Sequence, residues 1–247
     1  MTWRSKVNDL LRKSTGLELQ RAGLPRDYDE DAKAVIAAVR PWSMVKNEGL
    51  NALILATRYV SEHKIPGAIV ECGVWRGGSM QAAARTLLAL EDAGRDLYLF
   101  DTFEGMTPPT AEDVRSDSGQ SAEQMLGQSD KRELVWCVAD LADVRAGMAP
   151  IGYPDEKVHY VVGKVEETVP AQAPEEIAIL RLDTDWYSST RHELEHLYPR
   201  LASGGVLLID DFGDWEGCRK AVEEFLAETG ARLLLLRVDG GRAAVKP

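Results

Sequence analysis

From residue 68 onward, short runs of apolar residues alternate with segments that have the period of a helix. The strand-like runs are AIVEC (68–72), DLYLFD (96–101), KVHYVV (157–162), IAILRLD (177–183) and GGVLLIDD (204–211). The helical segments cover 79–91, 139–149, 186–201 and 215–229. Strands that are apolar on both faces are typical of a parallel sheet covered by helices on its two sides. The alternation therefore predicts a doubly wound α/β domain.

The C-terminal segment breaks this alternation. RLLLLRV (232–238) is followed by Asp239-Gly240-Gly241 and then by RAAVK (242–246). This order of strand, tight turn and strand predicts a hairpin, because Asp and Gly accept positive φ in such turns. The last strand is then expected to run antiparallel to the others. A mostly parallel sheet with one antiparallel C-terminal strand resembles the Rossmann-like fold of class I methyltransferases.

The charge and the cysteine content exclude several classes of protein. Acidic residues outnumber basic ones by 40 to 29, a formal net charge of −11. Nucleic-acid backbones are bound by Lys and Arg, so this balance disfavours a nucleic-acid partner. Cys72, Cys137 and Cys218 are odd in number and far apart, which indicates neither a disulfide framework nor a zinc knuckle.

The N-terminal segment has no apolar run long enough for a signal peptide, and no stretch of the chain approaches the roughly 20 apolar residues of a membrane span. We therefore expect a cytoplasmic protein without a membrane partner. Trp3, Val7, Leu10 and Leu11 lie at helical spacing, a stripe that covers a core or a subunit more often than a membrane. Residues 1–45 are predicted to form a helical cover and a contact in a homo-oligomer, and 46–247 the main domain.

A glycine-rich turn, Glu71-Cys72-Gly73-Val74-Trp75-Arg76-Gly77-Gly78-Ser79, joins the first strand-like run to the first helix. Glycines allow a sharp turn and close approach of a ligand, and a helix N-terminus offers N–H groups to an anion. The spacing is G-x-x-x-G-G, and a nicotinamide dinucleotide would place its pyrophosphate beside the carboxylate of Glu71. S-adenosylmethionine has no phosphate, so Glu71 is compatible with it and Ser79 would help to bind its carboxylate.

Asp101 ends the second strand-like run, where a carboxylate can accept both hydroxyls of a ribose. Both a nicotinamide dinucleotide and S-adenosylmethionine would use Asp101 in this way. The alternative explanation is structural, with the glycines forming a tight turn and Asp101 a local cap. The segment 102–130 that follows contains Pro108-Pro109 and no sustained period. Connections longer than about 12–15 residues are usually lids, binding loops or disordered linkers, and we predict a lid.

Carboxylates also end two later strand-like runs. Asp183 and Asp185 follow ILRL, and Asp210 and Asp211 end VLLIDD. If these strands are neighbours, their carboxylates meet in one crevice, and their pKa values would rise strongly without a neutralising cation. Oxygen ligands suit a hard divalent cation, so we expect Mg²⁺. Helix capping is the alternative explanation, because both motifs precede helices.

His192-Glu193-Leu194-Glu195-His196 matches the H-E-x-x-H pattern of zinc proteases. On a helix whose apolar face contains Leu194 and Leu197, the two histidines share the opposite face. We therefore expect a solvated polar face there, and a zinc protease would give no reason for the glycine-rich turn.

With these features together, the chain resembles the magnesium-dependent O-methyltransferases of the macrocin (tylosin-type) family, which methylate sugar hydroxyls of macrolides and other natural products. More distantly, it is similar to catechol O-methyltransferase. The resemblance covers about residues 40–230 and is carried by IVECGVWRGGSM, LYLFDTFEGM, ILRLDTDWYSST, GGVLLIDDF and GCRKAVEEF. The most specific part is the pair LDxDxYxST and DDF.

The resemblance implies roles for individual residues. Those implied to bind the cofactor are Glu71, Gly73 and Ser79 at the methionine end, Asp101 at the ribose, Val165 and Glu166 beside adenine, Met44 as a cover, and Asp183. The residues implied to hold the metal are Asp183, Asp210 and Asp211. Trp186 stands where catechol O-methyltransferase has its lysine base, so the catalytic base is expected to be a carboxylate, Asp183 or as second choice Asp185.

The function implied is transfer of a methyl group from S-adenosylmethionine to a sugar hydroxyl of a glycosylated natural product, with Mg²⁺ activating the hydroxyl. A catechol-type enzyme that methylates a small aromatic diol is the alternative within the same chemistry. Two alternatives from other classes are a nicotinamide-dependent oxidoreductase and a non-catalytic cofactor-binding subunit. The glycine spacing and Glu71 disfavour the first, and the strand-end carboxylates disfavour the second.

Overall fold

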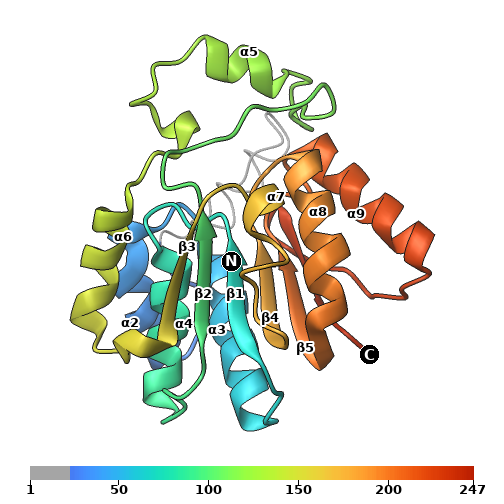
Figure 1. Ribbon diagram of the computed structural model, residues 1–247. Helices are drawn as coiled ribbons and strands as arrows, with labels where there is room; N and C mark the ends of the chain where they lie inside the picture. Colours follow the sequence, from blue (N-terminus) through green and yellow to red (C-terminus); the bar gives the residue numbers. More distant parts are fainter. Residues whose placement is uncertain (1–22) are drawn as a thin grey trace, which may run out of the picture.

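A seven-stranded sheet lies at the centre of the structure, a computed structural model that describes residues 23–247 (Figure 1). The strands are β1 (Ala68–Cys72), β2 (Leu97–Asp101), β3 (Val158–Val162), β4 (Ile177–Leu182), β5 (Leu201–Ile209), β6 (Leu236–Val238) and β7 (Gly241–Val245). Their spatial order is β3-β2-β1-β4-β5-β7-β6. Neighbours among β1–β5 pair in parallel, whereas β7 pairs antiparallel with both β5 and β6. The predicted sheet with one antiparallel strand is confirmed.

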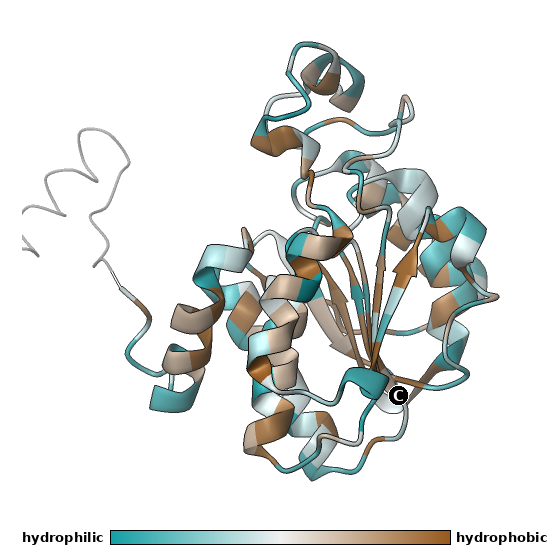
Figure 2. Ribbon diagram, turned by 60° about the vertical axis from the view of Figure 1, so that its left-hand side comes forward, coloured by the Kyte–Doolittle hydropathy of each residue, from teal (hydrophilic) through white to brown (hydrophobic). Residues whose placement is uncertain are grey.

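Helices cover both faces of this sheet (Figure 1). One face packs against α7 (Val165–Thr168), α8 (Tyr187–Leu197) and α9 (Glu216–Thr229), and the other against α3 (Asn47–Glu62), α4 (Gly78–Ala89) and α6 (Leu141–Met148). Successive strand residues point to opposite faces, so Ile69 joins the second core and Val70 the first. The strands are hydrophobic along most of their length, as their burial on both faces requires (Figure 2).

The remaining helical elements are short or lie outside the two layers. They are α2 (Glu30–Val39), α5 (Ala122–Gly127) and the 3₁₀ segments η1 (Arg40–Trp42), η2 (Leu134–Trp136), η3 (Ala149–Ile151), η4 (Asp155–Lys157) and η5 (Tyr198–Arg200). Helix α2 begins at the Asp29 cap and packs through Ile36 and Val39 against α3 and α4. The apolar stripe expected at Trp3, Val7, Leu10 and Leu11 lies outside the described residues.

The segment expected to be a structureless lid is more ordered than its sequence indicates. Residues 102–130 contain α5, and Val114 and Arg115 form isolated bridges with Ser121 and Trp215. This part of the chain lies beyond the carboxyl ends of the strands, where Figure 1 shows α5 at the top of the molecule. A buried carboxylate, Asp113, supplies the contacts that a search for periodicity does not detect.

The C-terminal hairpin also differs in extent from the prediction. Only Leu236–Val238 pair with β7, although the predicted strand RLLLLRV begins at residue 232. Leu233 and Leu235 pack against the core and Leu234 is exposed, so this run contributes side chains to the core before it joins the sheet. The remaining predicted strands agree with the structure within a few residues.

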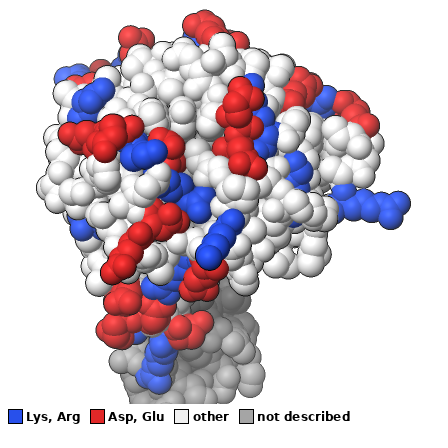
Figure 3. Space-filling view, turned by 60° about the horizontal axis from the view of Figure 1, so that its bottom comes forward, with Lys and Arg blue, Asp and Glu red and all other residues white. Residues whose placement is uncertain are grey.

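Among residues 23–247, no helix is both long enough and apolar enough to cross a membrane. The face of the molecule seen from below Figure 1 carries acidic and basic side chains side by side (Figure 3). That face lies at the end of the sheet opposite α5, away from the strand-end carboxylates.

Candidate active site

A cavity of about 290 Å³ opens at the carboxyl edge of the sheet. The predicted site residues that line it are Met44, Gly73, Asp101, Val165, Glu166, Asp183, Asp185, Asp210 and Asp211. The segments that surround it follow β1, β2, β3, β4 and β5, together with residues 44–49 and the β6–β7 turn. Open α/β sheets bind ligands at this edge. The structure thus brings all but two of the predicted residues to one cavity.

The glycine-rich turn passes very close to the end of β4. Gly73 has φ +81°, and a Cβ at this position would lie 1.9 Å from the carbonyl oxygen of Asp183. No side chain fits at that distance, and the left-handed φ also favours glycine. The first turn after β1 therefore lies against the backbone of Asp183, at the end of β4.

Asp101 holds this turn in place. Its Oδ2 accepts hydrogen bonds from the backbone N–H groups of Val74 and Trp75 at 2.6 and 3.0 Å, and its Oδ1 accepts one from Phe103 at 2.7 Å. Burial raises the pKa of Asp101, and these backbone hydrogen bonds act in the opposite direction. Asp101 is both a turn anchor and a cavity-lining residue, and its contact with a ribose stays a prediction.

Glu71 and Ser79 lie in the wall beneath the cavity and are not among the residues that line it. Glu71 is 1% exposed and Ser79 is 5% exposed. Burial raises the pKa of Glu71 to about 8, although the nearby Arg181 lowers it. Direct contact of these two residues with a cofactor stays a prediction.

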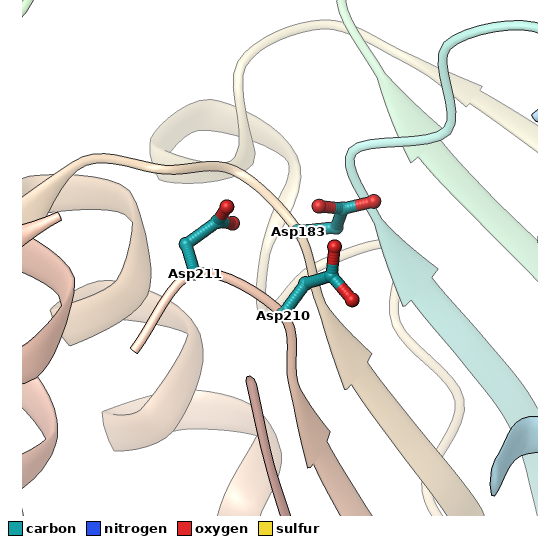
Figure 4. A group of neighbouring side chains, drawn as sticks. All are labelled: Asp183, Asp210 and Asp211. Carbon is teal, nitrogen blue, oxygen red and sulfur yellow. The ribbon is translucent and has the colours of Figure 1, made fainter. Parts of the chain in front are cut away.

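Three carboxylates, Asp183, Asp210 and Asp211, come together beside the cavity (Figure 4). One oxygen from each lies within 4.8 Å of one oxygen of the others. Asp183 follows β4, and Asp210 and Asp211 follow β5, which is its neighbour in the sheet. We call this group the carboxylate triad. The structure brings together these three side chains, as the two strand-end motifs predicted, and their role as metal ligands stays a prediction.

Arg181 is the residue of this site that sequence reasoning missed. Its Nη1 donates hydrogen bonds to Glu71 Oε1 at 2.6 Å and to Asp183 Oδ2 at 2.5 Å, and its Nη2 lies 2.8 Å from Asp210 Oδ1. The signal was an arginine inside the apolar run ILRLD. A charge in a strand buried on both faces requires a partner of opposite sign.

The pKa values of the cluster follow from this arrangement. Burial raises the pKa of Asp185 and of Asp210 to about 6 each. Burial, with the neighbouring charges of Asp185 and Asp183, raises the pKa of Asp211 well above its ordinary range. The carboxylates at this edge outnumber the single guanidinium of Arg181, so a further cation bound to them would lower these raised pKa values and favour their charged forms.

Four non-glycine residues that line the cavity have left-handed backbone conformations. Their φ angles are 45° at Trp75, 47° at Cys137, 64° at Asp185 and 52° at Asp239. Such residues cost about 1–3 kcal/mol each and are found preferentially at functional sites. At Asp185 this conformation lies in the turn between β4 and α8. The carboxylate of Asp185 is not one of the three in the triad.

The N-terminal segment closes one side of the cavity. Lys46 Nζ lies 2.7 Å from Asp239 Oδ2 in the β6–β7 turn, and both residues line the cavity. Met44 lies beside them and is 46% exposed. Residues distant in sequence thus meet at the opening, and the role of Met44 as a cover of the cofactor stays a prediction.

The H-E-x-x-H residues form no metal site with a third His, Cys, Asp or Glu in the described part of the chain. The two imidazole rings are 4.4 Å apart, and His192 Nε2 lies 2.9 Å from the carbonyl oxygen of Val169. The expectation of a solvated face is therefore wrong in detail, because α7 packs beside α8 and half-buries both rings. Glu193 points to the other side, where it is fully buried.

Comparison with known proteins identifies the family. Residues 8–245 match the protein-family model described as macrocin-O-methyltransferase (TylF). The chain belongs to the macrocin O-methyltransferase family. It is accordingly an S-adenosylmethionine-dependent O-methyltransferase, and membership of this family sets aside the oxidoreductase, the zinc protease and the non-catalytic subunit.

Two curated relatives of this macrocin O-methyltransferase family member support the assignment. An 8-demethyl-8-(2,3-dimethoxy-alpha-L-rhamnosyl)-tetracenomycin-C 4'-O-methyltransferase of Streptomyces olivaceus is 33% identical over 198 residues, 80% of this chain and 72% of that protein. A mycinamicin III 3''-O-methyltransferase of Micromonospora griseorubida is 31% identical over 197 residues, 80% of this chain and 75% of that protein.

The structure of the O-methyltransferase NovP has the same fold. It is 27% identical in sequence, with a TM-score of 0.71, and the match covers 83% of this chain and 82% of NovP. A putative caffeoyl-CoA O-methyltransferase from Staphylococcus aureus, 13% identical with a TM-score of 0.55, shares the fold alone. The match to these solved O-methyltransferase structures confirms the fold class predicted from the sequence.

Proposed function

We propose that this protein is a divalent-metal-dependent enzyme that transfers a methyl group from S-adenosylmethionine to a sugar hydroxyl of a glycosylated natural product. The observation that carries this proposal is the carboxylate triad beside a cavity in a chain of the macrocin O-methyltransferase family. A relative whose name includes a rhamnosyl group supports a sugar as the acceptor.

The donor set fits a hard divalent cation such as Mg²⁺. Asp183, Asp210 and Asp211 offer three carboxylate oxygens within 4.8 Å of one another, which is the ligand chemistry that Mg²⁺ prefers. The raised pKa values of Asp210 and Asp211 support the same proposal, because carboxylates gathered at one buried site favour a bound cation. A cation held by these residues would act as a Lewis acid and lower the pKa of an acceptor hydroxyl.

We assign the role of general base to Asp185, which was the second choice from the sequence. Asp183 belongs to the triad, and one of its oxygens is engaged by Arg181. Asp185 lines the same cavity and lies outside the triad, so its carboxylate is available to an acceptor hydroxyl. General bases contribute about 10²–10⁴-fold to a rate.

The cofactor is proposed to lie against the ends of β1, β2 and β3. Gly73 and Asp101 border this part of the cavity, Val165 and Glu166 flank the adenine, and Met44 covers it. Glu71 and Ser79 would act on the methionine end from beneath. The ordered 102–130 segment and residues 44–46 would exclude water, which strengthens electrostatic interactions at the reacting groups.

Measurement of methyl transfer tests this proposal. Glycosylated natural products and small catechols are incubated with the enzyme, Mg²⁺ and S-adenosylmethionine carrying a labelled methyl group. We expect label in a sugar-bearing product and loss of activity in excess EDTA. Full activity in EDTA would contradict the metal role, and methylation of catechols alone would contradict the sugar acceptor. Cytoplasmic location and assembly into a homo-oligomer stay predictions from the sequence.

A further inference from the structure

Arg181 is a cation buried inside the sheet. Its side chain is 4% exposed, and the strand register places it opposite Glu71 of β1. Arginine does not lose its proton in proteins, so this side chain is buried in its charged form. Burial of a charge is costly unless oppositely charged groups surround it. The structure supplies three such carboxylates, and two of them belong to the triad.

The guanidinium engages one oxygen of each of those two triad carboxylates. Asp183 Oδ2 accepts a hydrogen bond from Nη1, and Asp210 Oδ1 lies 2.8 Å from Nη2. The second oxygen of each carboxylate is then left for another ligand. The planar donors of arginine fix the orientation of a carboxylate, which the single ammonium of lysine does not do.

Two physical effects of Arg181 on a nearby divalent cation have opposite signs. Its positive charge repels the cation, so removal of the charge alone would tighten cation binding. Its hydrogen bond to Asp183 and its ion pair with Asp210 orient the two carboxylates, so removal of the side chain would loosen cation binding. The sign of the change in affinity therefore separates the two effects.

We propose that Arg181 is a positioning residue that orients Asp183 and Asp210 for a divalent cation and, through Glu71, connects this site to the glycine-rich turn. The proposal rests on the metal role proposed above. The carboxylates of Glu71 and Asp183 accept hydrogen bonds from the same atom, Nη1 of Arg181. One donor group therefore joins the glycine-rich turn to the triad. Partners that orient metal ligands typically contribute 10–100-fold to metal affinity.

Titration of the purified, chelator-treated enzyme with Mn²⁺ tests the proposal, with free Mn²⁺ measured by electron paramagnetic resonance. We expect the Kd for Mn²⁺ to rise about 10–100-fold in Arg181→Gln and in Arg181→Lys. An unchanged or lower Kd in folded Arg181→Gln would overturn the positioning role. Lysine keeps the charge, so a rise in Arg181→Lys is the effect of lost geometry.

Arg95→Lys is the matched control. Arg95 is 10% exposed, pairs with Asp92 and donates to the carbonyl oxygens of Ile65 and Gly67. Arg95 precedes β2 and these partners precede β1, so it lies at the opposite edge of the sheet from the triad. We expect this variant to lower the melting temperature and to leave the Kd for Mn²⁺ unchanged. A rise in Kd equal to that of Arg181→Lys would show a general effect of stability and overturn the proposal.

If the Arg181 variants do not fold, the double variant Glu71→Gln/Arg181→Gln tests the positioning role instead. It removes the buried Arg181–Glu71 ion pair as a whole, so that neither member of this pair is left without the other. We expect its Kd for Mn²⁺ to exceed that of Glu71→Gln about 10-fold or more. An equal or lower Kd would overturn the inference. A wild-type enzyme that binds no Mn²⁺ would overturn both this inference and the proposed metal role, whereas normal binding with unaffected variants overturns the inference alone.

Discussion

The carboxylate of Asp113 accepts a hydrogen bond from the backbone N–H of Tyr187 at 2.7 Å, which fixes the 102–130 segment to the first residue of α8. Its other oxygen accepts hydrogen bonds from the backbone N–H and the hydroxyl of Thr110 at 2.6 and 2.9 Å. A Cβ on Gly217, in the first turn of α9, would lie 2.2 Å from Asp113 Oδ1. Asp113 therefore joins the 102–130 segment to the N-terminal ends of two helices beside the cavity.

Asp113→Ala is expected to destabilise the protein and to weaken acceptor binding. The variant removes the acceptor of the Tyr187 and Thr110 backbone N–H groups, whose hydrogen bonds are partly buried, at about 0.5–1.5 kcal/mol each. The carbonyl oxygen of Thr107, which lines the cavity, accepts a hydrogen bond from the Trp186 indole at 2.9 Å. Loss of the Asp113 contacts with Thr110 would leave this nearby part of the cavity wall less firmly held. Urea unfolding should show a lower free energy of unfolding, and initial rates a higher KM for the acceptor.

The control for this substitution is Asp117→Ala in the same segment. Asp117 is 67% exposed and pairs only with Arg115 among the described residues. Such pairs contribute at most about 1 kcal/mol, so stability and KM should stay close to those of the wild type. Equal effects of the two substitutions would contradict a specific anchoring role for Asp113.

The sheet and most of the site follow from local sequence patterns. Apolar runs mark the strands, and Asp183 and Asp210 belong to one site because neighbouring parallel strands end at one edge. Gly73 was identified through its spacing, and the physical reason is that a Cβ at this position would lie 1.9 Å from the carbonyl oxygen of Asp183. These features depend on residue type and order alone.

The contacts that complete the site depend on tertiary packing. Arg181 could be recognised as a buried charge, but its three partners come from three strands or strand ends. Asp113 lies in a segment without periodicity, and its partner Tyr187 is 74 residues away. Helical period placed His192 opposite the core, yet α7 covers that face, a contact that no periodicity within α8 encodes.

Asp210→Asn tests the triad as a metal site. The amide keeps the size of the side chain and removes one anionic ligand, so metal-dependent methyl transfer should fall by more than about 100-fold. Asp214→Asn is the matched control, because Asp214 lines the cavity and is outside the triad. Rates measured across a range of Mg²⁺ concentrations distinguish the two variants. Normal turnover of Asp210→Asn at low Mg²⁺ would contradict the assignment.

Asp185→Asn tests the proposed base. The amide cannot accept a proton from the acceptor hydroxyl, so kcat should fall about 10²–10⁴-fold. Asp185 is outside the triad, so affinity for Mn²⁺ and for S-adenosylmethionine, measured by calorimetry, should stay within a few fold of the wild type. A large loss of metal affinity with unchanged kcat at saturating metal would assign Asp185 to the metal site instead.

Glu193→Gln is expected to stabilise the protein increasingly as the pH rises. Glu193 is fully buried, and its carboxylate accepts a hydrogen bond from the Thr184 hydroxyl at 3.0 Å. Burial raises its pKa well above the ordinary value of 4.5. A group with a raised folded-state pKa contributes stability that is fully present below its unfolded-state pKa and is lost as the pH rises through the folded-state pKa.

Glutamine keeps an oxygen for the Thr184 hydroxyl and carries no charge, so its contribution does not change with pH. The free energy of unfolding of Glu193→Gln should exceed that of the wild type by more than about 1 kcal/mol at pH 8.5 and by less at pH 5.5. Denaturant unfolding at both pH values measures this difference. Glu195→Gln, an exposed neighbour on α8 that pairs with Arg191, is the control and should show no such gain. A difference that shrinks as the pH rises would mean that Glu193 is stabilised as a carboxylate in the folded protein.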